Sequence, residues 1–283
     1  MIDLTISIVN YNVKDQLESC LKSIYKETLE LSFEVIVVDN ASSDKSIEMI
    51  KVNFPQVKLI ANRENLFFSK AHNQAYNVSS SRYFLLLNPD TIIRDNVFKK
   101  MIDFMDSIQE VGACGPKLVN ERMEHEWSGE NFPDLLYGIY EVSLVNAVFP
   151  SNSVKRRKIM PDWDRNDTRE VDTIGGSCLM IRREIVQKTG LLDEKFTLYW
   201  EEIDWCKRIK EAGYKVYFFA SAIIIHYWGT STSLLDRRVK DKHYFNSLLY
   251  YYKKNFGQNT FFILRLLYFF MNVAVNIKRT FIL

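Results

Sequence analysis

Residues 83–91 have the sequence YFLLLNPDT, and this stretch decides the fold. Its five apolar residues, Tyr83–Leu87, predict a strand that is buried on both faces, as in a parallel sheet covered by helices. Pro89 ends that strand, because proline has no N–H to donate to the sheet. Asp90 is therefore expected at the carboxyl end of a buried strand, the edge where open α/β sheets bind ligands. A plain Asn-Pro-Asp turn would show the same pattern, so the functional interpretation depends on the rest of the chain.

Strands and helices alternate on both sides of this stretch. Apolar, β-branched runs predict strands over residues 4–10, 33–38, 57–61, 112–116, 216–219 and 223–225, and after the diglycine at 175–176. Helical spacing of apolar residues predicts helices over 13–28, 44–53, 69–77, 96–109, 183–189, 201–213 and 236–256. This order indicates βαβ units, and therefore an α/β fold with a mostly parallel central sheet and helices on both faces.

The composition, 47% apolar and 25% charged residues over 283 positions, is that of a globular protein with a substantial core. We expect one domain over residues 1–256, in which 117–170 form an irregular insertion that shapes a partner or substrate surface. The basic run Lys155–Lys158 is not accompanied by a stripe of aromatics, so nucleic acid is not an expected partner. The four cysteines form no CxxC pair, which favours reduced thiols in the cytosol. No secretory signal precedes the first strand.

Residues 257–283 form an apolar, helical C-terminal extension. The longest uncharged apolar stretch in it begins at Leu266 and spans about a dozen residues, whereas a membrane span needs about 20. Aromatic residues flanked by Arg265, Lys278 and Arg279 suit a helix that lies in the membrane interface. A contact with a second copy of the chain, giving a homo-oligomer, is the alternative. The first interpretation predicts a cytoplasmic protein associated peripherally with the inner face of the plasma membrane.

Several polar residues are expected beside Asp90, because they also follow strands or begin helices. Asp39 ends the second strand, and His226 stands before a Gly/Ser/Thr loop. Three acidic residues crowd the first turn of the helix that begins at Glu201: Glu201, Glu202 and Asp204. Acidic residues there commonly complement the helix dipole, but the preceding Tyr199-Trp200 pair would also raise the proton affinity of a carboxylate.

Six motifs in this order, SIVNYN, EVIVVDNASSD, LLLNPD, GGSCLMIRRE, YWEEIDWCKR and HYWGTS, resemble those of the family 2 glycosyltransferases, in particular the bacterial rhamnosyltransferase-like branch. The resemblance covers about residues 4–256. It implies a GT-A fold, a dTDP- or UDP-linked sugar donor, a Mn²⁺ or Mg²⁺ ion and inversion at the anomeric carbon. The acceptor implied is a hydroxyl of a growing, lipid-linked cell-surface glycan, and rhamnose is a candidate for the sugar.

Carried over to this sequence, the resemblance implies roles for individual residues. Asp90 and His226 would hold the metal ion. Asn88 occupies the first Asp position of the family's D-x-D motif, and Phe67 stands where the family usually has glycine. Residues near the donor would be Val9, Asn10, Tyr11, Asp39, Asn40, Asn65, Asn73, Asn88, Asp90, Gly229 and Ser231.

The resemblance also implies a catalytic base at Glu202, with Glu201 and Asp204 as alternatives inside the same cluster. Gly175, Gly176 and Trp200 would contact the acceptor.

Two other functions fit parts of the sequence. A sugar-nucleotidyltransferase would want a glycine-rich, basic phosphate loop near the N-terminus, and none is present. A non-catalytic subunit of a polysaccharide-assembly complex would explain Asn88 as a decayed metal site. Retention of Asp90, Glu202 and His226 together argues against that interpretation.

Overall fold

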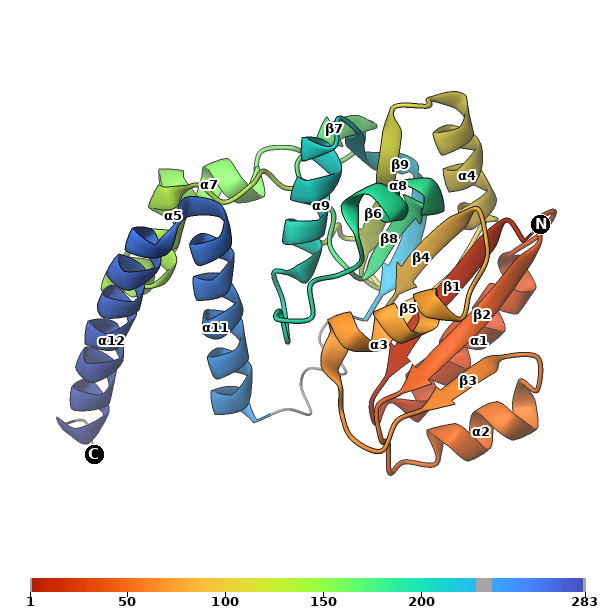
Figure 1. Ribbon diagram of the computed structural model, residues 1–283, viewed down its shortest axis with the longest axis horizontal. Coiled ribbons are helices and arrows are strands. Elements are labelled where there is room, and N and C mark those ends of the chain that lie inside the picture. The colour runs from red at the N-terminus through yellow and green to blue at the C-terminus, as the bar shows by residue number, and fades with distance from the viewer. Residues whose placement is uncertain (1, 228–235, 282–283) are drawn as a thin grey trace.

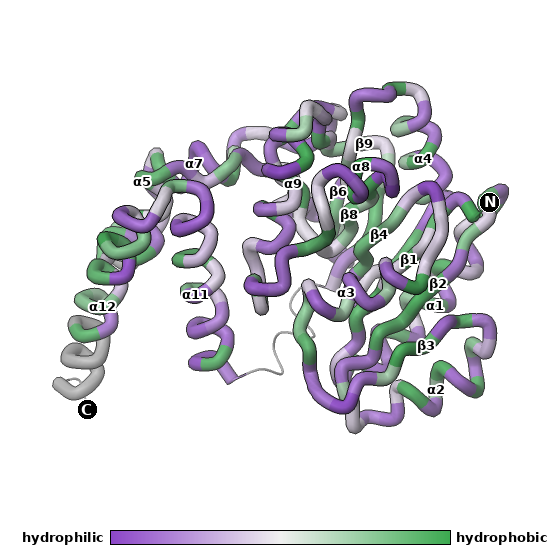
Figure 2. The backbone as a smooth tube through the Cα atoms, viewed as in Figure 1, coloured by the Kyte–Doolittle hydropathy of each residue, from purple (hydrophilic) through white to green (hydrophobic). Residues whose placement is uncertain are grey.

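The computed structural model describes residues 2–227 and 236–281. A nine-stranded sheet forms the centre of the molecule, with the strand order β3-β2-β1-β4-β8-β6-β9-β5 and β7 paired to β9. Helices cover both faces, and a helical hairpin made of α11 and α12 projects at the side away from β3 (Figure 1). Hydrophobic residues are concentrated along the central strands, as Figure 2 shows.

The first half of the sheet is parallel, as the sequence predicts. It contains β1 (Leu4–Asn10), β2 (Phe33–Asp39), β3 (Lys58–Ala61) and β4 (Tyr83–Leu87). The register pairs Ile8 with Leu87 and Asn10 with Asp39, so the carboxyl ends of these strands meet at one edge. The intervening helices are α1 (Lys14–Glu27), α2 (Ser46–Asn53) and α3 (Phe67–Asn77), and α3 begins two residues earlier than expected.

The second half of the sheet is mixed. The strand β8 (Cys178–Arg182) lies antiparallel between β4 and β6 (Val111–Val119), while β6 pairs in parallel with β9 (Lys215–His226). The short strands β5 (Thr91–Ile92) and β7 (Arg169–Val171) both run antiparallel to β9. Two separate strands were expected over 216–225, but β9 is continuous, because β6 pairs with both halves across a register shift between Pro116 and Lys117.

The apolar faces of the helices explain the two main cores. Helices α1 and α4 (Val97–Ser107) pack on one face of the sheet. On the other face lie α3, α8 (Arg183–Thr189) and α9 (Glu201–Glu211). As the sequence predicts, α8 is closed by Gly190, whose φ of 75° is one that glycine adopts without strain.

The expectation that residues 117–170 are irregular was wrong. The strand β6 continues to Val119, and three short helices follow: α5 (Leu135–Glu141), α6 (Leu144–Val148) and α7 (Ser153–Ile159). Side-chain caps begin two of them, because Asp134 accepts from the Tyr137 amide and Asn152 accepts from the Val154 and Lys155 amides.

The C-terminal hairpin pairs α11 (Arg237–Phe256) with α12 (Gln258–Phe281), joined at Gly257 (Figure 1). One face of α12 packs into a third core with α5 and α11, through Leu264 and the half-buried Phe261, Leu267 and Tyr268. The opposite face is apolar and exposed, with the residues Phe262, Ile263, Leu266, Phe269, Phe270 and Val273. Within the described residues, no helix is both long and apolar enough to cross a membrane.

Candidate active site

A cavity of about 350 Å³ opens at the carboxyl ends of β1, β2 and β4. The side chains around it come from the parallel half of the sheet, from the 117–170 region, from the diglycine loop and from the start of α9. Its lining residues include Val9, Tyr11, Asn40, Asn65, Phe67, Asn88, Asp90, Trp127, Ser128, Glu130, Gly175, Gly176, Tyr199, Glu201 and Glu202. The edge of the sheet predicted to bind ligands is therefore the edge that carries the cavity.

Asp90 and His226 meet because β5 pairs with β9. The register places Thr91 opposite His226, and the Tyr227 amide donates to the Asp90 carbonyl at 2.8 Å. Asp90 Oδ1 lies 3.3 Å from His226 Nε2, and both side chains are buried. Asn88 Nδ2 is 3.4 Å from the same imidazole nitrogen. The three residues that the sequence assigned to one site are thus adjacent.

Glu126 contacts the outer nitrogen of His226, and sequence reasoning did not identify it. Its Oε2 is 2.7 Å from His226 Nδ1. Burial lowers the pKa of His226, but the carboxylates of Asp90 and Glu126 outweigh burial and raise that pKa to about 9. A carboxylate on the outer nitrogen of a histidine also orients the ring and fixes its tautomer. The carboxylates of Asp90 and Glu126 therefore stabilise positive charge at the His226 imidazole and next to its Nε2.

A divalent ion fits the donor atoms present here. Asp90 Oδ1 is buried and, apart from its 3.3 Å approach to His226 Nε2, has no polar partner among the described residues. A carboxylate oxygen and an imidazole nitrogen are ligands that Mn²⁺ accepts, whereas Mg²⁺ prefers oxygen. The described residues contain no group of three His, Cys, Asp or Glu side chains that could hold a metal by themselves. Phosphate oxygens or water would have to supply the remaining ligands.

The end of the cavity beside β1 and β2 is built in two layers. Val9, Tyr11, Asn40 and Asn65 line it directly. Asp39 lies behind them, fully buried, where its Oδ2 accepts from Asn10 Nδ2 at 2.7 Å and its Oδ1 accepts from the Ser42 amide at 2.9 Å.

Asn73 is placed apart from the cavity. Its Nδ2 donates to the Leu192 carbonyl and to Glu194. It therefore ties α3 to the loop after α8. Gly229 and Ser231, also assigned to the donor, lie outside the described residues.

Phe67 lines the cavity in an unusual backbone conformation. Its φ is +60°, a region that glycine enters freely and that costs other residues about 1 kcal/mol or more. This is the position where the family pattern has glycine. Asn65 Oδ1 accepts from the Phe67 amide at 2.8 Å, and the Phe67 ring packs on His243 of α11, with ring centroids 4.6 Å apart. These contacts hold the strained residue in place.

Glu201 and Glu202 both line the cavity, in different environments. Glu201 is buried, and its Oε2 has no hydrogen-bond partner among the residues that the structure describes. Burial together with the charge of Glu202 raises the pKa of Glu201 well above the usual range. Burial also raises the pKa of Glu202, to about 7, while backbone amides and Lys158 lower it and Glu130 raises it. Glu201 therefore holds its proton more tightly than an ordinary glutamate does, and Glu202 can accept a proton near neutral pH.

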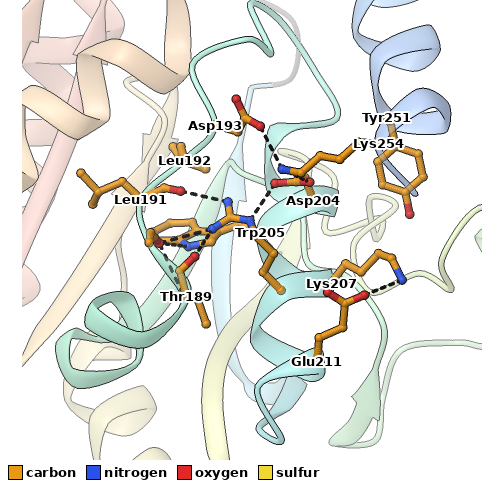
Figure 3. A network of polar contacts seen from close by, with 12 residues as sticks. Thr189, Leu191, Leu192, Asp193, Asp204, Trp205, Lys207, Glu211, Tyr251 and Lys254 are labelled. Carbon is orange, nitrogen blue, oxygen red and sulfur yellow. Dashed lines mark hydrogen bonds and ion pairs between the residues drawn. The ribbon is translucent and has the colours of Figure 1, made fainter. Parts of the chain in front are cut away.

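Asp204, on the same helix, does not line the cavity. Its Oδ2 is 2.8 Å from Arg208 Nε, and its Oδ1 is 2.8 Å from Lys254 Nζ of α11 (Figure 3). Trp200 is likewise buried, between Tyr244, Tyr251 and Tyr252 in the third core. These placements give both residues a role in joining α9 to the hairpin.

The diglycine loop lies close both to the turn that carries Asp90 and to Glu202. The Asn88 amide donates to the Ser177 carbonyl at 2.9 Å, so the loop docks on the turn that carries Asp90. At Gly176 an added Cβ would come within 3.0 Å of the Phe68 ring and 3.9 Å of Glu202 Cβ. Gly176 therefore keeps space open beside Glu202.

Glu130 and Lys158 form a second feature that the sequence did not reveal. Glu130 lines the cavity, its carboxylate is paired with the largely buried ammonium of Lys158, and its backbone pairs with Thr173. Lys158 belongs to the basic run noted in the sequence, but it points inward. In the sequence, the one available signal was the helical spacing of α7, because a helix turns one residue of a four-residue basic run toward the core.

Comparisons with known proteins identify the family of this chain and its fold. A family model described as "Glycosyl transferase family 2" matches residues 5–190. The N-acetylglucosaminyl-diphospho-decaprenol L-rhamnosyltransferase of Mycobacterium tuberculosis is 24% identical over 244 residues, which cover 81% of this chain and 77% of that protein. Rhamnosyltransferase WbbL of Escherichia coli is 23% identical over 232 residues, covering 78% and 82%.

One solved structure shows the same fold at low sequence identity. It is mannosyltransferase PcManGT from Pyrobaculum calidifontis in complex with GDP-Man and Mn²⁺, with a TM-score of 0.57 and 14% identity. The match covers 95% of this chain and 71% of that one. The expectation of a GT-A fold is thereby confirmed.

Proposed function

The chain belongs to glycosyl transferase family 2, and from this premise we propose that it transfers rhamnose, with inversion, from a dTDP- or UDP-linked donor to a lipid-linked glycan. The observation that carries the proposal is the single cavity that joins Val9, Tyr11 and Asn40 to Asp90 and Glu202. The M. tuberculosis and E. coli relatives are named as rhamnosyltransferases, and the first is named for a sugar linked through diphosphate to decaprenol. This supports both the sugar and the acceptor class.

Asp90 and His226 would hold a divalent ion, Mn²⁺ in the first place, with Glu126 orienting the imidazole. Such an ion offsets the charge of the two phosphates and stabilises the leaving nucleoside diphosphate. Asn88 is neutral where a second aspartate would bring another charge, so Asp90 is the principal carboxylate. The presence of Mn²⁺ in the PcManGT complex supports this choice of metal.

Glu202 is the proposed base. In an inverting transfer, the bond from the acceptor oxygen to the anomeric carbon forms as the bond to the phosphate oxygen breaks, and the acceptor hydroxyl gives up a proton. Glu202 faces the cavity with a pKa near 7, so it is available to take that proton at neutral pH. Glu201 lies beside it, and the raised pKa of Glu201 means that it competes for the proton with less negative charge than an ordinary glutamate would carry.

The exposed face of α12 suits a membrane surface, where a lipid-linked acceptor is found. Phe262, Leu266, Phe269 and Val273 recur at three- and four-residue intervals along it, and the exposed Arg265 lies between them. A helix with such a face lies in the lipid interface with its cations near anionic headgroups. We place the enzyme peripherally on the cytoplasmic leaflet.

The test is product identity. The full-length protein is incubated with dTDP-rhamnose or UDP-sugars, a short-chain diphospholipid glycoside, and either Mn²⁺ or EDTA. We expect nucleoside diphosphate to be released together with a glycoside of inverted anomeric configuration, in the Mn²⁺ reaction only. Release of pyrophosphate would indicate a nucleotidyltransferase instead, and no turnover of any donor would favour a non-catalytic subunit.

A further inference from the structure

We propose that Trp127 is the platform on which the terminal sugar ring of the acceptor stacks, and that residues 126–130, EWSGE, form the wall of the acceptor subsite. The inference rests on the proposed glycosyl transfer and names the class of acceptor: a pyranoside that presents an apolar C–H face. A lipid alcohol or phosphate without such a ring would not use this surface.

The exposure of Trp127 is the first observation. Its side chain is 52% exposed, whereas Trp163, Trp200 and Trp205 are 8%, 3% and 1% exposed. An indole buries a large apolar area when it is covered, so one left open inside a cavity offers much binding free energy. Trp127 lines the same cavity as Asp90 and Glu202.

The indole is also held firmly. The guanidinium carbon of Arg165 lies 4.9 Å from the centroid of the Trp127 ring, and His125 packs edge-on at 5.7 Å. Arg165 is fully buried and donates to the carbonyls of Ser128, Ile159, Met160 and Trp163. An aromatic side chain fixed before binding loses little conformational entropy when a ligand stacks on it.

The two ends of the 126–130 segment are each tied to a residue that bears on the proposed site. Glu126 contacts His226, beside the proposed metal position. Glu130 is paired with Lys158 and influences the protonation of Glu202. Between them, Gly129 has a φ of 77° and leaves little room for a Cβ, which would lie 3.1 Å from the Trp163 ring. The backbone at Gly129 therefore packs closely on the core. Trp127 stands in the sequence between Glu126, which contacts His226, and Glu130, which influences Glu202.

The acceptor fits this position better than the donor sugar does. The donor is anchored through its nucleotide among Val9, Tyr11 and Asn40, and its sugar must be enclosed between Asp90 and Glu202. Trp127 is half exposed, so a ligand stacked on it continues into solvent, as a glycan attached to a lipid must. Glu130, three residues away in the same wall, supplies a carboxylate that can accept hydrogen bonds from sugar hydroxyls.

The experiment measures binding directly, without turnover. Methyl β-N-acetylglucosaminide and methyl α-rhamnoside are titrated into the full-length protein in the presence of UDP or dTDP, with saturation-transfer NMR to identify the ring protons in contact. For the better glycoside, Trp127→Ala should weaken binding by about five- to tenfold, the range expected for losing one aromatic stacking contact. Trp127→Phe should stay within about twofold of wild type, because it keeps an aromatic face.

The matched control is Phe149→Ala, which removes an aromatic ring that is similarly exposed but lies outside the cavity. It should bind the glycoside as wild type does. An unchanged glycoside affinity in Trp127→Ala would overturn the proposal. An equal loss of UDP or dTDP affinity in that variant would also overturn it, as would a lack of saturation transfer to both glycosides in the wild-type protein. A failure of the proposed function is a separate result, since it concerns donor turnover and not glycoside binding.

Discussion

Replacing Asp204 by asparagine should destabilise the protein without removing its chemistry. Asp204 is 1% exposed. One of its carboxylate oxygens pairs with Arg208 of the same helix, and the other pairs with Lys254 of α11. Figure 3 shows this carboxylate between α9 and the hairpin, with Asp193 on the other side of Lys254. Asparagine keeps the shape but removes the charge that both cations share.

The size of the effect follows from these contacts. Breaking a buried ion pair by removing one partner costs about 3–5 kcal/mol when the other charge is left without compensation. Here the side chains of Arg208 and Lys254 are 19% and 30% exposed, so water compensates part of each charge. Asp193 Oδ2 also lies 2.9 Å from Lys254 Nζ, and the Leu191 carbonyl accepts from Arg208. We therefore expect a loss of about 2–3 kcal/mol in the free energy of unfolding.

The assay is urea denaturation followed by tryptophan fluorescence, with transfer activity measured on the same samples well below the unfolding transition. The matched control is Glu211→Gln on the same helix, which removes an ion pair of 2.9 Å to Lys207 whose carboxylate side chain is 60% exposed. That pair should contribute less than about 0.5 kcal/mol. The reasoning is refuted if the two variants unfold at the same urea concentration and Asp204→Asn nevertheless abolishes transfer. Asp204 would then act in the reaction itself.

Three further outcomes are expected. Glu202→Gln should keep nucleotide binding and lower the transfer rate by about two to four orders of magnitude. The wild-type rate should rise with pH through about 7 as Glu202 loses its proton, and a flat pH profile from 5 to 9 would contradict this. Asp90→Ala should lose the response to Mn²⁺ in a metal titration, whereas full activity in EDTA would exclude a metal-dependent mechanism. Replacing Phe262, Leu266 and Phe269 together by serine should abolish flotation with anionic liposomes; unchanged flotation with a dimer falling to monomer would assign the face to a second copy of the chain.

The parallel half of the fold could be predicted because its signals are local. Short apolar runs such as Tyr83–Leu87 indicate buried strands, and the polar turns after them show where each strand ends. The antiparallel strand β8 could not be placed in the same way, since its apolar run is equally compatible with either direction. Its position depends on contacts with β4 and β6, which lie far away in the sequence.

The site was predictable where a motif and a strand end coincide, as at Asp90 and His226. Helical periodicity separates Glu202 from Asp204 only when the packing partner is known, and the partner here is Lys254 on α11. Glu126 and Glu130 were missed for a similar reason. They lie in a region without periodicity, and their importance comes entirely from His226 and Lys158, which the fold brings to them.

The anchoring of residues 126–130 at both ends limits how enzymes of this design can diverge. Substitution of Trp127 changes the surface offered to an acceptor and leaves the anchors in place. Gain or loss of one residue between Glu126 and Glu130 would instead detach His226 or Lys158 from its partner, so it would damage the transfer reaction along with acceptor choice. Evolution toward new acceptors should therefore proceed here by substitution at fixed length.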